Sequence, residues 1–190
     1  MTHSNHRLVP SQNGLKLNAG SLRAGVEDAF DGVGSQRSVK ARVKVTKPKV
    51  TSAELAPKYP IVVTVNRSTF QLRLFKRLKL KKTYPIAVGQ AGLETPAGLY
   101  HVQDKTVDPA WNVPNSPWAG DLAGTVIPGG APDNPLKARW LGIFNGAGIH
   151  GTSDIGSLGS AASHGCIRMD IPDVIELYDQ VPVGAPVFIS

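Results

Sequence analysis

Cysteine is almost absent from this chain of 190 residues, in which Cys166 is the only one. A single cysteine excludes an internal disulfide bond, so the sequence offers no disulfide framework. This scarcity does not place the protein in the cytosol, because an exported enzyme with a working thiol also avoids partner cysteines. We therefore expect Cys166 to be a free thiol.

Long apolar runs are missing as well. No stretch reaches the roughly 18 residues that a membrane-spanning helix needs, and the first ten residues are polar, without the apolar segment of a signal peptide. We expect no membrane span in this chain. If the protein is exported, we expect its targeting segment to be absent from the chain.

Aromatic residues make up only 6% of the chain, whereas 41% of its residues are hydrophobic. The core must therefore consist mainly of Val, Ile, Leu and Ala. The 20 glycines and 15 prolines are many for a helical protein and indicate turns between strands. The composition thus favours a fold rich in β-structure.

The net charge of +7 is concentrated in the N-terminal part. Residues 1–60 hold ten Lys and Arg against four Asp and Glu, whereas residues 61–190 hold eleven against ten. A basic segment is attracted to anionic polymers such as cell-wall teichoic acids, or to nucleic acid. No aromatic residues are interleaved with the charges, so we expect no nucleic-acid partner. The alternatives are anionic cell-wall polymers and a merely solvated basic face.

We expect two parts, a basic N-terminal segment over residues 1–57 and a main domain over residues 58–190. Within the segment, apolar residues at helical spacing predict a short amphipathic helix over 19–31. Residues 39–45 alternate between apolar and mostly basic side chains, which predicts a strand with one buried face and one basic face. Such a strand could pair with the sheet of the main domain.

The main domain shows the alternation of period two that is typical of strands, which predicts a mainly β fold, a twisted sheet or sandwich. One substantial helix is expected over residues 170–181, with Asp170 as its N-cap. Residues 103–135 form a long loop rich in Pro, Gly, Asn and Asp that holds Trp111 and Trp118. Long ordered loops are often lids or binding walls, so these two Trp residues are candidates for substrate contact as well as for packing the loop.

The main chemical signal is the run Ser163-His164-Gly165-Cys166, read together with His150 upstream. A thiol attacks as its thiolate, and a nearby imidazole can take its proton. Backbone N–H groups can then hold the oxyanion, and Gly165 lets a substrate carbonyl approach the main chain. The run therefore contains a nucleophile, a base and a possible oxyanion hole.

This run and His150-Gly151-Thr152 resemble the signature of the L,D-transpeptidase catalytic domain, the YkuD-like family. Further stretches agree with it in the same order, namely residues 84–89, 95–100 and 134–140. The resemblance covers about residues 58–190, and the N-terminal segment resembles the end of a peptidoglycan-binding domain. It implies a mainly β fold, no cofactor, an extracytoplasmic site of action in the cell wall or periplasm, and acyl transfer on peptidoglycan tetrapeptide stems.

The resemblance also implies roles for single residues. Cys166 would attack the carbonyl of the third residue of a stem, and His150 would take the thiol proton and give it to the leaving D-alanine. The main-chain carbonyl of Gly151 would orient the imidazole. The side-chain amine of a second stem would then resolve the thioester into a 3→3 cross-link.

The neighbouring residues admit alternatives. His164 either shapes the oxyanion hole or anchors the loop, and the N–H groups of Gly165 and Cys166 are the oxyanion donors we expect. Arg168 either binds a substrate carboxylate bidentately or donates hydrogen bonds to main-chain carbonyls of residues 163–166, here named the Cys loop. Ser163 is expected to make a local side-chain-to-backbone bond.

The same residues also suggest other kinds of site and other classes of protein. His150, His164 and Cys166 could supply three ligands to zinc, but only one closely spaced pair is present, so we expect no metal site. A papain-like peptidase usually places its cysteine at the start of a long helix, whereas here the helix begins several residues later. A non-catalytic wall-binding module would lack the Cys or the His. Water as acyl acceptor would make the enzyme an L,D-carboxypeptidase.

Overall fold

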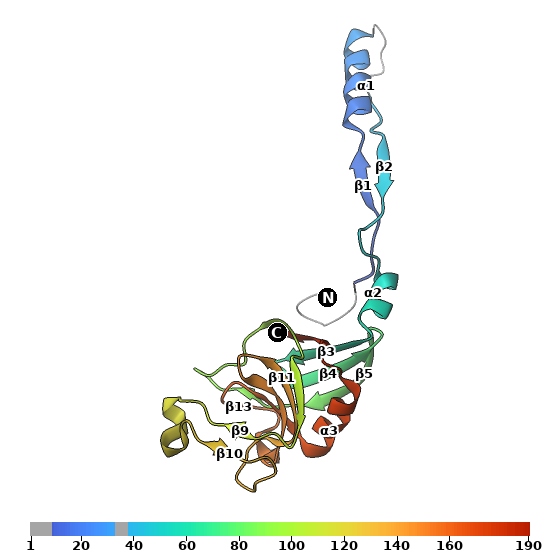
Figure 1. The fold of residues 1–190 in the computed structure, drawn as a ribbon. Coiled ribbons are helices and arrows are strands. Elements are labelled where there is room, and N and C mark those ends of the chain that lie inside the picture. Colours follow the sequence, from blue (N-terminus) through green and yellow to red (C-terminus); the bar gives the residue numbers. More distant parts are fainter. Residues whose placement is uncertain (1–8, 33–37) are drawn as a thin grey trace.

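The computed structural model describes residues 9–32 and 38–190. Figure 1 shows a body built by the chain after α2 and a narrow arm, in blue and cyan, built by the residues before it. Residues 1–8, whose polarity argued against a signal peptide, lie outside the described part. No helix in the described ranges is long and apolar enough to cross a membrane.

The larger sheet of the body has five strands in the order β5-β4-β3-β15-β7. Three of them follow one another as antiparallel neighbours: β3 (Ile61–Asn66), β4 (Gln71–Lys76) and β5 (Lys79–Pro85). The C-terminal strand β15 (Pro186–Ile189) lies parallel to β3 and antiparallel to β7 (Gly98–His101). β15 is thereby an interior strand of the sheet, between β3 and the edge strand β7.

The second sheet has four strands in the order β14-β12-β11-β8. β11 (Lys137–Phe144) pairs antiparallel with β8 (Asp104–Val107) and with β12 (Ala147–Thr152). β12 pairs parallel with β14 (Ile167–Asp170). A separate short parallel pair is formed by β6 (Val88–Gly89) and β13 (Ala161–Ser163). In the sequence, β13 lies between β12 and β14.

Buried side chains from both sheets and from α3 (Ile171–Gln180) form one core. The helix packs on β11, β12 and β14 through Val174 and Leu177, which are fully buried. The Asp170 side chain accepts a hydrogen bond from the N–H of Ile171, as expected of an N-cap. The predicted fold class, mainly β with one main C-terminal helix, is confirmed.

The segment predicted as a long loop is more regular than expected. It supplies β8 to the second sheet, and it contains the hairpin of β9 (Trp111–Asn112) and β10 (Val126–Ile127) with the 3₁₀-helix η1 (Pro117–Leu122) between them. Asn134 is buried and holds the loop together. Its Nδ2 donates to the carbonyls of Pro109 and Pro128 at 2.9 Å, and its Oδ1 accepts from the N–H of Leu136 at 2.8 Å.

The arm consists of a two-stranded ribbon with a helix between its strands. β1 (Gly14–Leu17) pairs antiparallel with β2 (Val43–Thr46), and α1 (Ala19–Asp31) matches the helix predicted over 19–31. A short helix, α2 (Ser52–Lys58), joins the arm to the body and is capped by Thr51 and Glu54.

The strand predicted over residues 39–45 is wrong in its bounds and in its surroundings. β2 begins only at Val43, and it pairs with β1 rather than with the sheet of the main domain. Val43 and Val45 are 53% and 57% exposed, because none of the described residues forms a second layer over the ribbon. The alternation of side chains is present, but it does not produce the predicted buried face.

We expect the body to keep its stability when the arm is removed. No residue of β1, α1, β2 or α2 is buried, so a chain shortened to residues 58–190 loses little packing. Its melting temperature should stay within about 3 °C of that of the full chain, since 1 kcal/mol corresponds to a few degrees at this size. Differential scanning calorimetry of both chains measures this, and a fall of about 10 °C or more would make the arm part of the body's fold.

Candidate active site

The two candidate catalytic residues come from neighbouring parallel strands. His150 lies on β12 and is 3% exposed, and Cys166 immediately precedes β14. The register pairs Ile149 with Ile167, so the chain at Cys166 lies beside Gly148. A backbone hydrogen bond from Gly148 acts on the thiol. The register thereby places Cys166 two positions along the strand pair from His150, although the two residues are sixteen positions apart in the sequence.

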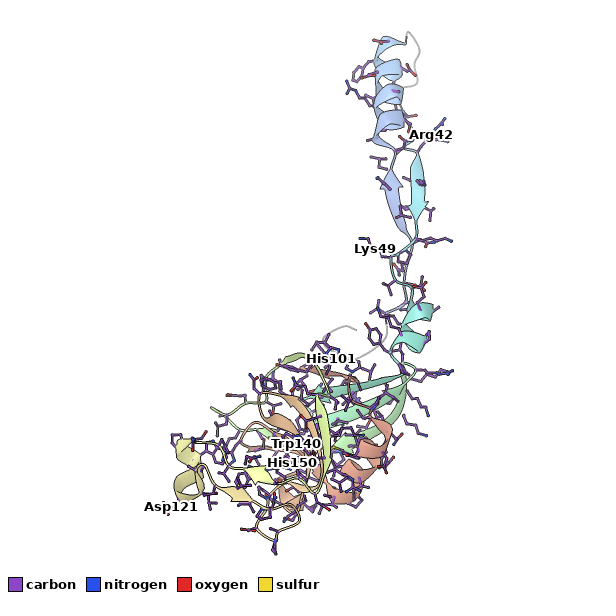
Figure 2. The ribbon with its side chains drawn as sticks, viewed as in Figure 1. Arg42, Lys49, His101, Asp121, Trp140 and His150 are labelled. Carbon is purple, nitrogen blue, oxygen red and sulfur yellow. The ribbon has the colours of Figure 1, made fainter. Side chains whose placement is uncertain are left out.

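The imidazole of His150 is held from two sides. Its Nδ1 lies 2.8 Å from the carbonyl oxygen of Gly151, which can only accept, so Nδ1 carries the hydrogen and Nε2 has a free lone pair. The ring of Trp140 stacks on it with centroids 6.2 Å apart, and Figure 2 shows the two labelled side by side. Gly151 therefore holds the imidazole in the way the resemblance implied.

Burial is the main cause that lowers the pKa of His150 to about 4. The hydrogen bond to Gly151 opposes this shift, and the positive charge of Arg168 adds to it. Burial also raises the pKa of the Cys166 thiol, while Gly148 and Arg168 act in the opposite direction. At neutral pH both groups therefore rest in their neutral forms, a thiol and an imidazole.

The Cys loop is folded around the hydroxyl of Ser163. The Ser163 Oγ donates to the carbonyl of Cys166 and accepts from the N–H of Gly165 at 3.2 Å. This is the local bond expected of Ser163. Gly165 has a φ of +109°, in the region that favours glycine. Because its N–H is engaged by Ser163, the N–H of Cys166 is the better-placed oxyanion donor of the two.

Arg168 has a partner that the sequence did not reveal. Its Nη1 lies 3.5 Å from a carboxylate oxygen of Asp154, which stands on the connection between β12 and β13. Its main chain forms a reciprocal pair of hydrogen bonds with Ala87. The guanidinium therefore links β14 to the connection between β12 and β13. In the strand register, Arg168 is the partner of His150.

The long loop reaches the Cys loop through Trp118. The indole of Trp118, on η1, stacks on the imidazole of His164 with centroids 4.1 Å apart and planes 10° from parallel. Both side chains are exposed to solvent. Trp111 lies on β9 and is half-buried. Trp118 and His164 therefore form one flat aromatic surface two residues from Cys166 in the chain. The sequence analysis named both residues as candidates but did not predict that they stack on each other.

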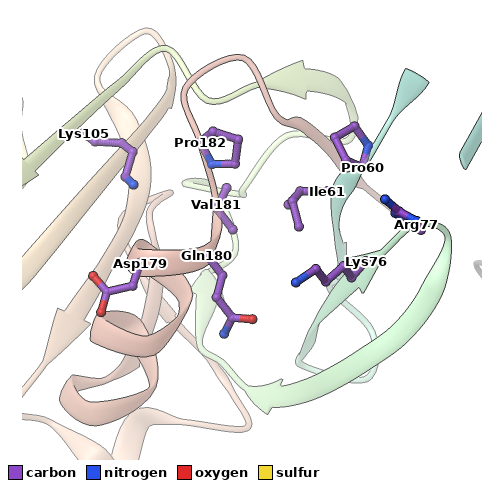
Figure 3. A pocket seen from close by; sticks show the side chains of 9 residues that line it. All are labelled: Pro60, Ile61, Lys76, Arg77, Lys105, Asp179, Gln180, Val181 and Pro182. Atoms are coloured by element: carbon purple, nitrogen blue, oxygen red, sulfur yellow. The ribbon is translucent and has the colours of Figure 1, made fainter. Parts of the chain in front are cut away.

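Neither a metal site nor a large cavity is seen at this centre among the described residues. Within residues 9–32 and 38–190, no three His, Cys, Asp or Glu side chains gather as metal ligands, so His150, His164 and Cys166 do not form the three-ligand zinc site. A cavity of about 550 Å³ lies between β3 and the end of α3, near Ile61 and Gln180 (Figure 3). Its lining includes neither Cys166 nor His150, so it is separate from this centre.

A thiol directly before β14 and a neutral imidazole on the neighbouring strand β12 are the kinds of group that a thiol-dependent acyl-transfer site uses. The family model of the L,D-transpeptidase catalytic domain (YkuD) matches residues 60–189 of this chain. This chain belongs to that family. Membership links it to transferases that act on peptidoglycan.

Two curated relatives are both 37% identical to this chain. One is the putative L,D-transpeptidase YqjB of Bacillus subtilis, matched over 67% of this chain and 70% of the relative. The other is the putative L,D-transpeptidase YkuD of Bacillus licheniformis, matched over 80% and 77%. The chain thus spans at least about two thirds of these proteins.

Solved structures share the fold. The catalytic domain of the E. faecium L,D-transpeptidase acylated by ertapenem is 26% identical, with a TM-score of 0.54 over 69% of this chain and 97% of that one. An L,D-transpeptidase from Mycobacterium smegmatis is 21% identical, with a TM-score of 0.55. The match covers 69% of this chain and only 58% of the mycobacterial one.

We expect His150 to make folding stability depend on pH between about 6.5 and 4. Its folded pKa, about 4, lies below the ordinary value of 6.5, so the unfolded chain binds the proton more readily in this window. Stability is therefore complete above pH 6.5 and falls as the pH drops towards 4, by at most about 1 kcal/mol per pH unit from this one group. Urea unfolding at pH 7, 6 and 5 measures the slope.

His150→Gln should flatten that slope, because glutamine does not titrate. His101→Gln is the matched control, since His101 is exposed on β7 and should leave the slope unchanged. Equal slopes for the parent and His150→Gln would show that His150 is not held neutral by burial.

Proposed function

We propose that this chain is a cysteine-dependent L,D-transpeptidase that forms 3→3 cross-links in peptidoglycan. The observation that carries the proposal is the placement of His150 on β12 and of Cys166 directly before the paired strand β14, in a chain of this family. The acyl donor is a tetrapeptide stem, and the acceptor is the side-chain amine on the third residue of a second stem. The place of action is extracytoplasmic, in the cell wall or periplasm.

The proton moves between sulfur and imidazole in each half of the reaction. As Cys166 Sγ bonds to the carbonyl carbon of the third residue, Nε2 of His150 takes the thiol proton. The oxyanion accepts a hydrogen bond from the N–H of Cys166. When the intermediate collapses, the bond to D-alanine breaks and His150 returns the proton to the leaving amine, which leaves a thioester on Cys166.

The second half reverses these roles. The incoming amine attacks the thioester carbonyl and loses a proton to His150, and the sulfur leaves as the thiol after regaining that proton. Gly151 keeps the imidazole in one tautomer throughout. Water in place of the amine would release a tripeptide, which is the L,D-carboxypeptidase alternative.

The residues around the thiol suit contact with a substrate of this kind. The stacked rings of Trp118 and His164 would form a wall for the stem, and Trp111 on β9 of the same loop is a further candidate for contact with it. Arg168 carries a positive charge near the site and would attract the stem's carboxylates, in competition with Asp154. Gly165 leaves space for the stem's main chain.

We expect Cys166→Ala to abolish turnover of a disaccharide-tetrapeptide, because the variant has no nucleophile. Intact-mass spectrometry of the parent should show an acyl group on Cys166, followed by cross-linked dimers. His150→Ala should lose roughly 10²–10⁴-fold in rate, the usual contribution of a general base, while His101→Ala should keep the parent's rate.

The products separate the alternatives. Dimers support the transpeptidase, whereas tripeptide alone would favour the L,D-carboxypeptidase. D-alanine released by Cys166→Ala at the parent's rate would refute the nucleophile. The same experiment with a carbapenem should add the whole drug mass to Cys166, since opening of the β-lactam ring expels no leaving group. The E. faecium relative acylated by ertapenem supports this expectation.

The arm, as part of residues 1–57, is proposed to hold the enzyme on anionic wall polymers. It carries exposed cations along its length, among them Arg42 and Lys49, which Figure 2 labels well away from the body. Its separation from residues 58–190 would let the catalytic body reach stems while the arm stays bound.

We therefore expect the chain shortened to residues 58–190 to sediment less with whole cell walls than the full chain does. The difference should shrink as salt rises beyond about 0.1 M, where the Debye length falls below about 10 Å. Activity on small soluble stems should be equal in the two chains. Equal sedimentation at low salt would refute this role of the arm.

A further inference from the structure

Thr95 makes two hydrogen bonds that connect distant parts of the chain to the Cys loop. It lies between β6 and β7 and is only 2% exposed. Its Oγ1 accepts from the N–H of Gly89 at 2.9 Å and lies 2.8 Å from the carbonyl oxygen of Gly165. A hydroxyl has one hydrogen, and a carbonyl can only accept. The hydroxyl hydrogen of Thr95 is therefore committed to Gly165.

This bond fixes the direction of the Cys166 N–H. The carbonyl of Gly165 and the N–H of Cys166 belong to one planar trans peptide unit, in which they point in opposite directions. Holding the carbonyl towards Thr95 thus aims the N–H away from it. A hydrogen bond at the carbonyl also polarises the unit and makes its N–H a stronger donor. Within the described residues, the N–H of Cys166 has no hydrogen-bond partner.

The segment that carries Thr95 is itself fixed against the Cys loop. Arg67 Nη1 donates to the carbonyl of Thr95 at 2.8 Å, and the N–H of Gln90 donates to the carbonyl of Ser163 at 2.9 Å. The turn is so tight that a Cβ on Gly89 would lie 2.1 Å from the carbonyl oxygen of Leu93 and 2.5 Å from the nitrogen of Thr95. The hydroxyl is therefore presented by a rigid support.

We propose that Thr95 is a positioning residue that aims the Cys166 N–H at the oxyanion of the tetrahedral intermediate. Ser163 holds the flanking peptide groups, and Thr95 holds the one that contains the donor. The inference rests on the proposed function, because it assigns Cys166 to attack on a carbonyl. Thr95 itself touches no reacting atom.

Two reagents separate this role from general support of the thiol. p-Nitrophenyl acetate is attacked at a carbonyl: the sulfur–carbon bond forms, an oxyanion develops, and p-nitrophenolate leaves. Iodoacetamide is attacked at a saturated carbon: the sulfur–carbon bond forms as iodide leaves, without an oxyanion. In both reactions the thiol loses its proton. Only the first depends on the Cys166 N–H.

We expect Thr95→Val to lower the rate of acylation by roughly 10–10²-fold, somewhat less than the loss of an entire oxyanion donor. Its alkylation rate should stay within about twofold of the parent, and Thr95→Ser should restore acylation because it keeps the hydroxyl. On tetrapeptide stems, kcat should fall while KM stays unchanged, since the bond is used in the transition state.

Thr64→Val is the matched control. Thr64 is also a fully buried threonine, but it lies on β3 and points to the opposite face from the core residues Val63 and Val65. It should change neither rate. Thr95→Ala, which adds no atom, carries the same expectation as Thr95→Val and replaces it if the valine disturbs folding, as judged by circular dichroism.

Each outcome decides the role. Equal losses of acylation and alkylation in Thr95→Val would reduce Thr95 to a structural support, and no loss in either would show that its hydroxyl is not used. A parent protein that is acylated by the ester but not by stems would overturn the proposed function and leave the role of Thr95 standing. A parent that is alkylated but never acylated would overturn both.

Discussion

The parallel pairing of β12 with β14 is the constraint on which the site depends. It pairs Ile149 with Ile167 and His150 with Arg168. Cys166 therefore lies beside the first residues of β12, the strand that carries the imidazole. Parallel neighbours require a crossover rather than a tight turn. Here the crossover contains η2 (Ile155–Ser157) and β13, and β13 pairs with β6. A slip of one residue in this register would turn His150 to the other face of the sheet.

Burial of this centre determines its resting state. It lowers the pKa of His150 and raises that of Cys166, so it favours the neutral form of both groups. Arg168 opposes a charge on His150 and favours one on Cys166, so it promotes loss of the thiol proton without stabilising an imidazolium. The pair therefore differs from a preformed thiolate–imidazolium pair. In the proposed mechanism, the thiol would therefore transfer its proton at the moment of attack.

Local patterns predicted local structure well. The spacing of apolar residues predicted α1 over 19–31, and Asp170 predicted the start of α3, because both signals act within a few residues. The surroundings of Val43 could not be predicted, since they depend on pairing with Leu17, far away in the sequence, and on whether another layer covers the ribbon. For the same reason β8 was taken for a loop. At the site, the motif predicted Cys166 and His150 as catalytic residues. The contacts of Asp154, Trp140 and Thr95 were not predicted, although residues 95–100 and 134–140 were part of the resemblance, because these contacts join parts of the chain that are distant in the sequence.

The case of Thr95 separates what a catalytic motif provides from what it leaves to the rest of the fold. In the proposed reaction, residues 163–166 would supply the nucleophile and the donor group, while the direction of that donor would depend on the Thr95 hydroxyl, 70 positions before Gly165. That hydroxyl is in turn placed by a turn that only glycine at position 89 permits and by Arg67 at its far side. An oxyanion donor contributes through its angle as much as through its presence. A chain with an intact motif but a changed support would therefore hold the same reactive groups and still stabilise the transition state poorly.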